Sequence, residues 1–275
     1  LVRWAEWYSL RMECVASSLA VAMNLGWGAK LRAAGPRLQA TPAFSAAIDA
    51  SCSAAMRRLQ ASVGSALKHA RTASDNTVLM VDDRCTHIFW QELVIAALRE
   101  FEAVCAIGCV RLLYNLARGI VGLFVETAEA CTASESRSTS ASIDWVCTVA
   151  NTGVLAFPLV SRLLARFENA IPDPYRTQLD TNCVKVALSN MVRDGVEWLA
   201  AAVVQDVQTI LCTSSSRWSA QDEDEGMDMA MAAVVATVAD YFDDFGVLLV
   251  QQHLEIVAEG VATGFAHVYL ECLLR

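Results

Sequence analysis

Apolar residues recur at every third or fourth position through most of this chain, and this periodicity constrains the fold more than any other feature. Such spacing places side chains on one face of a helix. No stretch alternates apolar and polar residues between turn residues, which is the pattern of a half-buried strand. The sequence therefore predicts an all-α fold. The clearest stripe consists of Met231, Val234, Val238, Tyr241 and Phe245, with Asp240, Asp243 and Asp244 around the other side.

Comparable stripes predict the other helices, and glycine, proline and polar residues mark their ends. Gly108 and Gly246 are expected at a bend and at a helix C-terminus. Pro158 predicts a kink or a local break. Asp173 is expected to cap a helix whose first residue is Pro174. The expected helices cover residues 4–25, 42–70, 82–101, 110–124, 142–167, 174–210 and 250–272.

The helix expected over 174–210 differs from the others because it carries two adjacent apolar stripes. Burial on both sides is typical of a helix at the centre of a bundle. The 275 residues are enough for one large helical domain or two packed ones. One stripe consists of Val184, Leu188, Met191, Gly195, Trp198 and Ala202, and the adjacent one consists of Val192, Val196, Leu199, Val203, Val207 and Ile210.

Composition excludes some classes of function. The net charge of −9 makes nucleic acid a poor partner, because phosphate binding rewards clustered Lys and Arg. The ten cysteines form no CxxC pair, which suits a reducing compartment and indicates a cytosolic protein. Two long apolar stretches, Val104–Glu126 and Ile143–Val160, approach the roughly 20 residues that a membrane span needs. Both contain charged residues, so we expect buried helices and no transmembrane segment.

No constellation of residues predicts a reaction. The glycines at 26 and 28 lack the Lys-Ser/Thr ending of a phosphate loop. The four histidines are dispersed, and none pairs with Cys or Ser in a catalytic motif. Asp240, Asp243 and Asp244 lie on a helix and lack the alternate oxygen donors of a calcium loop. We therefore predict no catalytic, cofactor-binding or metal-binding residues.

Two polar segments each allow two interpretations. The Ser- and Thr-rich segment 132–142 is expected to be a loop, either a plain linker or a phosphorylation target. The acidic run at 222–225 is either a solvated loop or a surface for a basic partner.

Several segments, in order along the chain, resemble one protein family. The segment 237–245, TVADYFDDF, is similar to the signature of the exocyst subunit called Sec-six, exocyst complex component three. The segments 144–157, 203–211 and 268–274 are similar to other parts of that family, over about residues 80–275 in total. The residues that carry the resemblance, as structural or interaction positions, are Thr237, Val238, Asp240, Tyr241, Phe242, Asp244 and Phe245, with Trp218 upstream.

The chain also departs from the family. The helix after the signature is usually basic, whereas this one carries Gln251, Gln252, His253, Glu255 and Glu259. A basic surface facing lipid or SNARE proteins is therefore in doubt. Family members begin with a coiled coil and continue past this point, so we expect an excised middle-to-C-terminal piece. Residues 1–80 do not align.

The resemblance implies an all-α fold, an elongated rod of consecutive antiparallel helical bundles, with an N-terminal bundle over 1–170 and a C-terminal bundle over 171–275. It also implies a non-enzymatic subunit of a vesicle-tethering complex, which holds secretory vesicles at the plasma membrane before fusion. The implied partners are other exocyst subunits, SNARE proteins and a peripherally bound vesicle or plasma membrane, and the implied location is cytoplasmic. Three alternatives remain: a helical adaptor or scaffold outside tethering, an integral membrane protein, and an all-α enzyme. An isoprenoid-synthase type of enzyme would need a second Asp-rich cluster facing the first across a bundle.

Overall fold

The structure is a computed structural model that describes residues 42–72, 78–81, 84–87, 89–132, 143–215 and 223–274. The helix expected over 4–25, nearly all of the Ser- and Thr-rich segment, and Trp218 lie outside the described residues.

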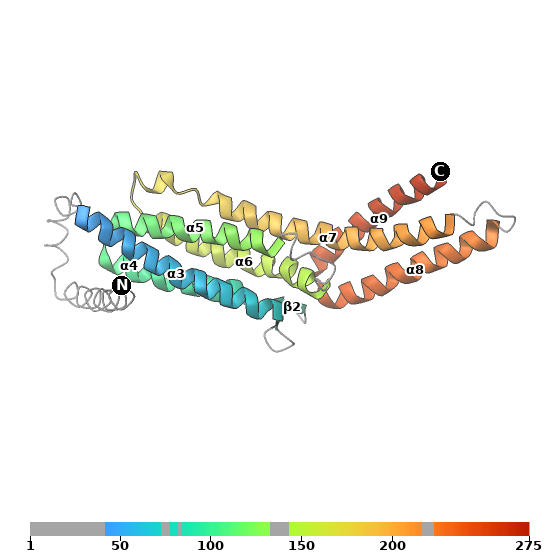
Figure 1. Cartoon of the computed structure of the whole chain (residues 1–275), viewed down its shortest axis with the longest axis horizontal. Coiled ribbons are helices and arrows are strands. Elements are labelled where there is room, and N and C mark those ends of the chain that lie inside the picture. The colour runs from blue at the N-terminus through green and yellow to red at the C-terminus, as the bar shows by residue number, and fades with distance from the viewer. Residues whose placement is uncertain are drawn as a thin grey trace, which may run out of the picture. The chain divides into compact units, whose positions relative to one another are not determined.

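Helices make up nearly all of the described chain (Figure 1). The all-α prediction is thereby confirmed. The short helix η3 covers Arg176–Gln178. The α-helices are α3 (Pro42–Thr72), α4 (Phe89–Ile107), α5 (Val110–Thr132), α6 (Ile143–Ala170), α7 (Asn182–Ser215), α8 (Glu223–Leu248) and α9 (Gln251–Leu273).

One small antiparallel hairpin was not expected. Strand β1 (Val78–Val81) pairs with β2 (Arg84–His87), so that Val81 lies opposite Arg84. The prediction that a helix starts at residue 82 is wrong, because α4 begins at Phe89. Strands of four residues are too short for an alternating pattern to stand out from the helical background.

The start of helix α7 differs from the prediction. The helix expected from Pro174 begins instead at Asn182, after η3. The Asn182 backbone N–H donates to Oδ1 of Asp180 at 3.0 Å, so Asp180 takes the place expected for Asp173. Asp173 accepts a hydrogen bond from Arg176 at 2.7 Å. The side chain nearest the first free backbone N–H groups, and not the proline, determines where α7 starts.

Proline and glycine have different effects inside these helices. α6 runs through Pro158 without interruption, so the predicted local break is wrong. Proline removes one backbone bond, and the flanking Ala156 and Val160 are fully buried, which keeps this 28-residue helix continuous. Gly108, in contrast, adopts φ 70° and separates α4 from α5, as expected.

Contacts divide the chain into two compact units, and the first contains described residues from 42–66, 92–124 and 160–182. The rings of Phe101 and Phe167, both buried, lie 4.4 Å apart between their centroids. On the surface, Arg58 of α3 donates two hydrogen bonds to the Glu100 carboxylate of α4, at 2.8 and 2.7 Å. These contacts join α3, α4 and α6 around one apolar core, to which Leu59, Leu116 and Ile120 also contribute.

The second unit contains described residues from 67–91, 125–159 and 183–275. Its core lies around α7, which packs against α6, α8 and α9. Most residues of the two predicted stripes of α7 are buried, whereas Val192, Trp198, Ala202 and Ile210 are half-buried. Burial on both sides agrees with the central position expected for this helix. The α7 residues with at most 3% exposure are Val184, Leu188, Met191, Val196, Leu199, Val203, Val207 and Leu211.

Candidate interaction surface on helices α8 and α9

Helix α8 carries all of the predicted motif residues that the structure describes, and it divides them between two faces. Phe245 has no exposed surface and joins the core of the second unit. Val238, Tyr241 and Phe242 are half-buried beside it. The Phe245 ring lies 5.7 Å from that of Tyr241 and 5.8 Å from that of Phe242. Most of the motif therefore anchors α8 to its neighbours.

The polar motif residues lie toward solvent. Asp240 and Asp244 are exposed, as is Asp243 between them, and Thr237 is half-buried. No group of three His, Cys, Asp or Glu side chains close enough to hold a metal ion is found among the described residues. The helix thus presents its carboxylates outward and its aromatic rings inward, as the amphipathic pattern indicated.

One polar contact joins α8 to α7. The Tyr241 hydroxyl donates to Oδ2 of Asp206 at 2.7 Å. Burial, as the largest cause, together with the hydrogen bond to Asp206 and the negative charge of Asp206, raises the pKa of Tyr241 to about 12. Asp206 could not be predicted as a partner, because pairing across two helices depends on their register in three dimensions.

The turn between α8 and α9 is held by a buried asparagine of α6. Asn151 has no exposed surface, and its Nδ2 donates to the Leu248 carbonyl at 2.6 Å. Its Oδ1 accepts a hydrogen bond from the Val250 backbone N–H at 3.0 Å. These two groups belong to the end of one helix and the start of the next, where backbone groups lack partners within the helix. Asn151 therefore ends α8 at Leu248, two residues beyond the stop expected at Gly246.

Helix α9 approaches α7 closely along a pair of glycines four residues apart. A Cβ atom on Gly260 would lie 2.9 Å from the Ala200 side chain, and one on Gly264 would lie 2.5 Å from the Val204 side chain. Small residues at this spacing let two helix backbones come close together. Gly153 of α6 meets Val192 of α7 in the same manner. The GxxxG spacing of Gly260 and Gly264 is visible in the sequence, and it is a signal from which this close contact between helices could have been predicted.

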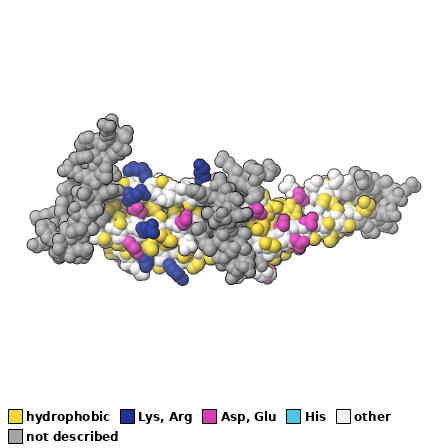
Figure 2. Space-filling view, turned by 90° about the horizontal axis from the view of Figure 1, so that it is seen from below, with side chains coloured by type: hydrophobic (Ala, Val, Ile, Leu, Met, Phe, Trp, Pro, Cys, Tyr) yellow, Lys and Arg dark blue, Asp and Glu magenta, His cyan; other side chains and the backbone are white. Residues whose placement is uncertain are grey.

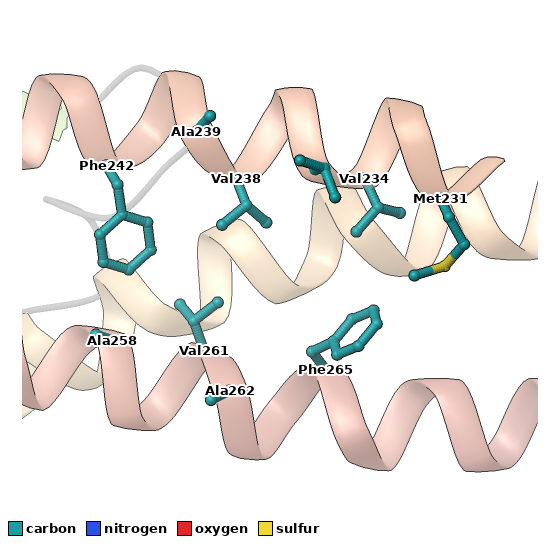
Figure 3. Close-up of a pocket in the computed structure, with 10 residues that line it drawn as sticks. Met231, Val234, Val238, Ala239, Phe242, Ala258, Val261, Ala262 and Phe265 are labelled. Carbon is teal, nitrogen blue, oxygen red and sulfur yellow. The ribbon is translucent and has the colours of Figure 1, made fainter. Parts of the chain in front are cut away.

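An apolar groove lies between α8 and α9. Figure 1 shows the two helices diverging from their connection, and Figure 3 shows side chains from both pointing into the space between them. The groove has a volume of about 510 Å³. Its lining is entirely apolar: Met231, Val234, Val235, Val238, Ala239 and Phe242 from α8, and Ala258, Val261, Ala262 and Phe265 from α9.

The helices that form this groove carry charge of one sign only. α8 contains seven acidic residues and α9 three, and neither contains Lys or Arg. Figure 2 shows acidic and apolar side chains over α8, in the right part of the view, with no dark blue among them. Asp243, Glu255 and Glu259 are exposed acids within one helical turn of lining residues, whereas Asp240 is exposed on the opposite face of α8.

A second hollow of about 360 Å³ lies between α6, α7 and α9, and it contains His253. This histidine is only 5% exposed, and its Nδ1 has no hydrogen-bond partner among the residues that the structure describes. Burial lowers the pKa of His253. Periodicity missed this residue, because polar side chains were not counted in the buried stripe of α9.

Two described helices, α6 and α9, are long and apolar enough to cross a membrane. The most apolar window of α6 is 56% buried inside the protein, as in the core helix of a soluble domain, whereas that of α9 is 22% buried. The exposed apolar residues of α9 include Ile256 and Leu270.

Long helices packed around a central helix define a helical scaffold. Its candidate site is the open apolar groove, a surface for other macromolecules. A family model described as exocyst complex component Sec6 matches residues 66–275. The chain therefore belongs to the Sec6 family of exocyst components, which are structural tethering subunits. A comparison with curated protein sequences gave no match.

The fold agrees with this assignment. The chain is similar to the crystal structure of the C-terminal domain of the exocyst subunit Sec6p, with a TM-score of 0.63 and 8% sequence identity. The similarity covers 81% of this chain and 62% of that one. At this identity the comparison shows a shared helical fold, and it confirms the fold that the resemblance implied.

Proposed function

We propose that this chain is a non-enzymatic subunit of an exocyst-like complex that tethers secretory vesicles at the plasma membrane. The match of the Sec6 family model over residues 66–275 carries the proposal. The α8–α9 groove supports it, because an exposed apolar lining next to solvent is typical of a surface that binds another protein. Other exocyst subunits are the first partners to expect, in the cytoplasm and at vesicle or plasma membranes.

Binding to SNARE proteins and peripheral association with membranes are finer parts of the same proposal. The charge of α8 and α9 affects them differently. Ten acidic residues without Lys or Arg disfavour an anionic bilayer, which attracts basic segments. They do not disfavour a protein partner with basic residues. We therefore expect any membrane association to depend on other subunits.

The predicted rod and the division into bundles over 1–170 and 171–275 belong to the proposal as well. Small-angle scattering of the chain in solution would give its longest dimension, and a value near that of a compact 29.8 kDa globule would contradict the rod. Limited proteolysis tests the boundary. Early cleavage near residue 170 would support the division, and early cleavage elsewhere with 165–185 intact would contradict it.

Co-purification with other exocyst subunits tests the proposed function directly. The chain, carrying an affinity tag, would be expressed with each of the other subunits, and stable pairs would be identified by size-exclusion chromatography. We expect at least one stable pair. If no subunit binds while the chain is folded by circular dichroism, the chain is a helical adaptor outside vesicle tethering.

A further inference from the structure

We infer that the groove between α8 and α9 binds one amphipathic helix of a partner protein, with an apolar stripe flanked by Lys and Arg. This inference deepens the proposed role as a protein-interaction surface, and it rests on that role. It names the chemistry of the partner and the place where that partner docks.

The shape and lining of the groove fit one apolar helical face. On α8 the lining runs from Met231 to Phe242, which is about 16 Å at 1.5 Å per residue, or three helical turns. Val235 in this lining is 64% exposed, although it faces other apolar side chains. Val234 and Val261 are at most 5% exposed and form the floor. Helices of this length bind such grooves through apolar residues at spacings of three and four.

The negative charge beside the groove indicates that basic residues flank the apolar stripe of the partner helix. Glu255 lies one helical turn before the lining residue Ala258, and Asp243 and Glu259 follow directly after the lining residues Phe242 and Ala258. All three carboxylates are exposed, and the described parts of α8 and α9 offer no cation to neutralise them. Complementary charges at the rim of an interface increase the association rate and exclude partners of the wrong sign.

The same charges disfavour the other occupants of an apolar groove. A second copy of the chain, docked through the same helices, would bring ten acidic residues against ten. An anionic membrane surface would be repelled for the same reason. A partner helix with an apolar stripe and basic flanks is complementary both to the apolar lining and to the acidic residues beside it.

Peptide binding to the whole chain tests the inference. The probes are two fluorescent 18-residue peptides with one leucine pattern, in which the remaining positions are Lys in one and Glu in the other. We expect fluorescence anisotropy to show binding of the Lys peptide at least tenfold tighter than that of the Glu peptide, and weaker binding as salt is raised. Equal affinities would overturn the inference.

A matched pair of double variants locates the binding. Val235→Asn with Ala239→Asn places two neutral polar groups in the groove. Ala236→Asn with Val247→Asn makes the same changes at exposed positions of α8 outside the lining. Circular dichroism should show the same helicity for both. We expect the groove variant to bind the Lys peptide at least fivefold more weakly than the control variant. Equal binding by the two would contradict the inference.

Two further readouts separate the alternatives. Binding of the chain to phosphatidylserine vesicles, reduced by the groove variant, would assign the groove to a membrane and overturn the inference. Co-purification with exocyst subunits separates it from the proposed function. If those subunits bind and the Lys peptide does not, the groove inference fails alone. If the peptide binds and no subunit does, the proposed function fails.

Discussion

Asn151 of α6 accepts a hydrogen bond from the backbone N–H of Val250, 3.0 Å away, at the point where α9 begins. The same side chain donates to the carbonyl of Leu248, where α8 ends. A single amide thus fixes the two helices that form the groove at their common end. The direction in which they diverge depends on this contact.

Replacement of Asn151 by Leu should destabilise the second unit. Leucine has a similar volume but leaves the Leu248 carbonyl and the Val250 N–H without this partner. We expect the free energy of unfolding to fall by about 2–4 kcal/mol. Urea denaturation followed by circular dichroism would measure the change. Asn169→Leu is the matched control, because Asn169 is an exposed residue of the same helix, and it should change stability by less than about 0.5 kcal/mol.

Alanine substitutions at two glycines should have opposite effects. A Cβ atom on Gly264 would meet Val204 at 2.5 Å, whereas one on Gly246 would meet nothing within 4 Å. Gly264→Ala should destabilise by about 1–3 kcal/mol through overpacking. Gly246→Ala should stabilise by about 0.5–1 kcal/mol, because alanine favours the helix. Val204→Ala should rescue Gly264→Ala, and failure of that rescue would argue against the close contact of α7 and α9.

Tyr241 should make stability depend on pH in the alkaline range. Its pKa is raised to about 12 when folded, and an unfolded tyrosine titrates near about 10. Between these values only the unfolded chain loses the proton, so the stabilising contribution is complete below about pH 10 and is lost as pH rises toward about 12. Urea midpoints measured across this range should fall more steeply for the native chain than for Tyr241→Phe. Parallel curves would show that Asp206 does not hold the hydroxyl in solution.

His253 should make the second unit sensitive to mild acid. Its folded pKa lies below the ordinary value of 6.5, so the unfolded chain takes up the proton first. Its contribution to stability is complete above about pH 6.5 and is lost as pH falls below that value. Arg193 and Glu197 of α7 line the same hollow and belong to its electrostatic environment. His253→Gln should flatten the pH dependence of the urea midpoint between pH 5 and 7, and an unchanged pH dependence would contradict this prediction.

Sequence periodicity predicted the helices well, because each buried stripe leaves a local record at three- and four-residue spacing. Val257, Val261 and Val268 are buried in α9 at spacings of four and seven residues, within the helix expected over 250–272. Helix starts were less predictable, since Asp180 and Asp173 are both plausible caps in sequence, and the short helix η3 between them moves the start of α7 to Asn182. The β1–β2 hairpin was missed because its strands are only four residues long.

The candidate surface could be predicted only in part. The resemblance located the motif of α8, and the amphipathic pattern gave the direction of Phe245 and Asp240. Asn151 was visible as one polar residue within an apolar helix, yet its two partners are 97 and 99 residues away in sequence. The groove depends on the angle between α8 and α9, which the pattern of either helix alone does not determine.

Helix α7 connects α6 and α9 mechanically. Its 34 residues form one uninterrupted helix that meets Gly153 of α6 through Val192 and Gly264 of α9 through Val204. A mechanical pull on α9 would therefore reach α6 through these two side-chain contacts and the turns of α7 between them, without crossing a loop. If vesicles pull on this subunit while they are captured, the second unit is built to transmit that force stiffly.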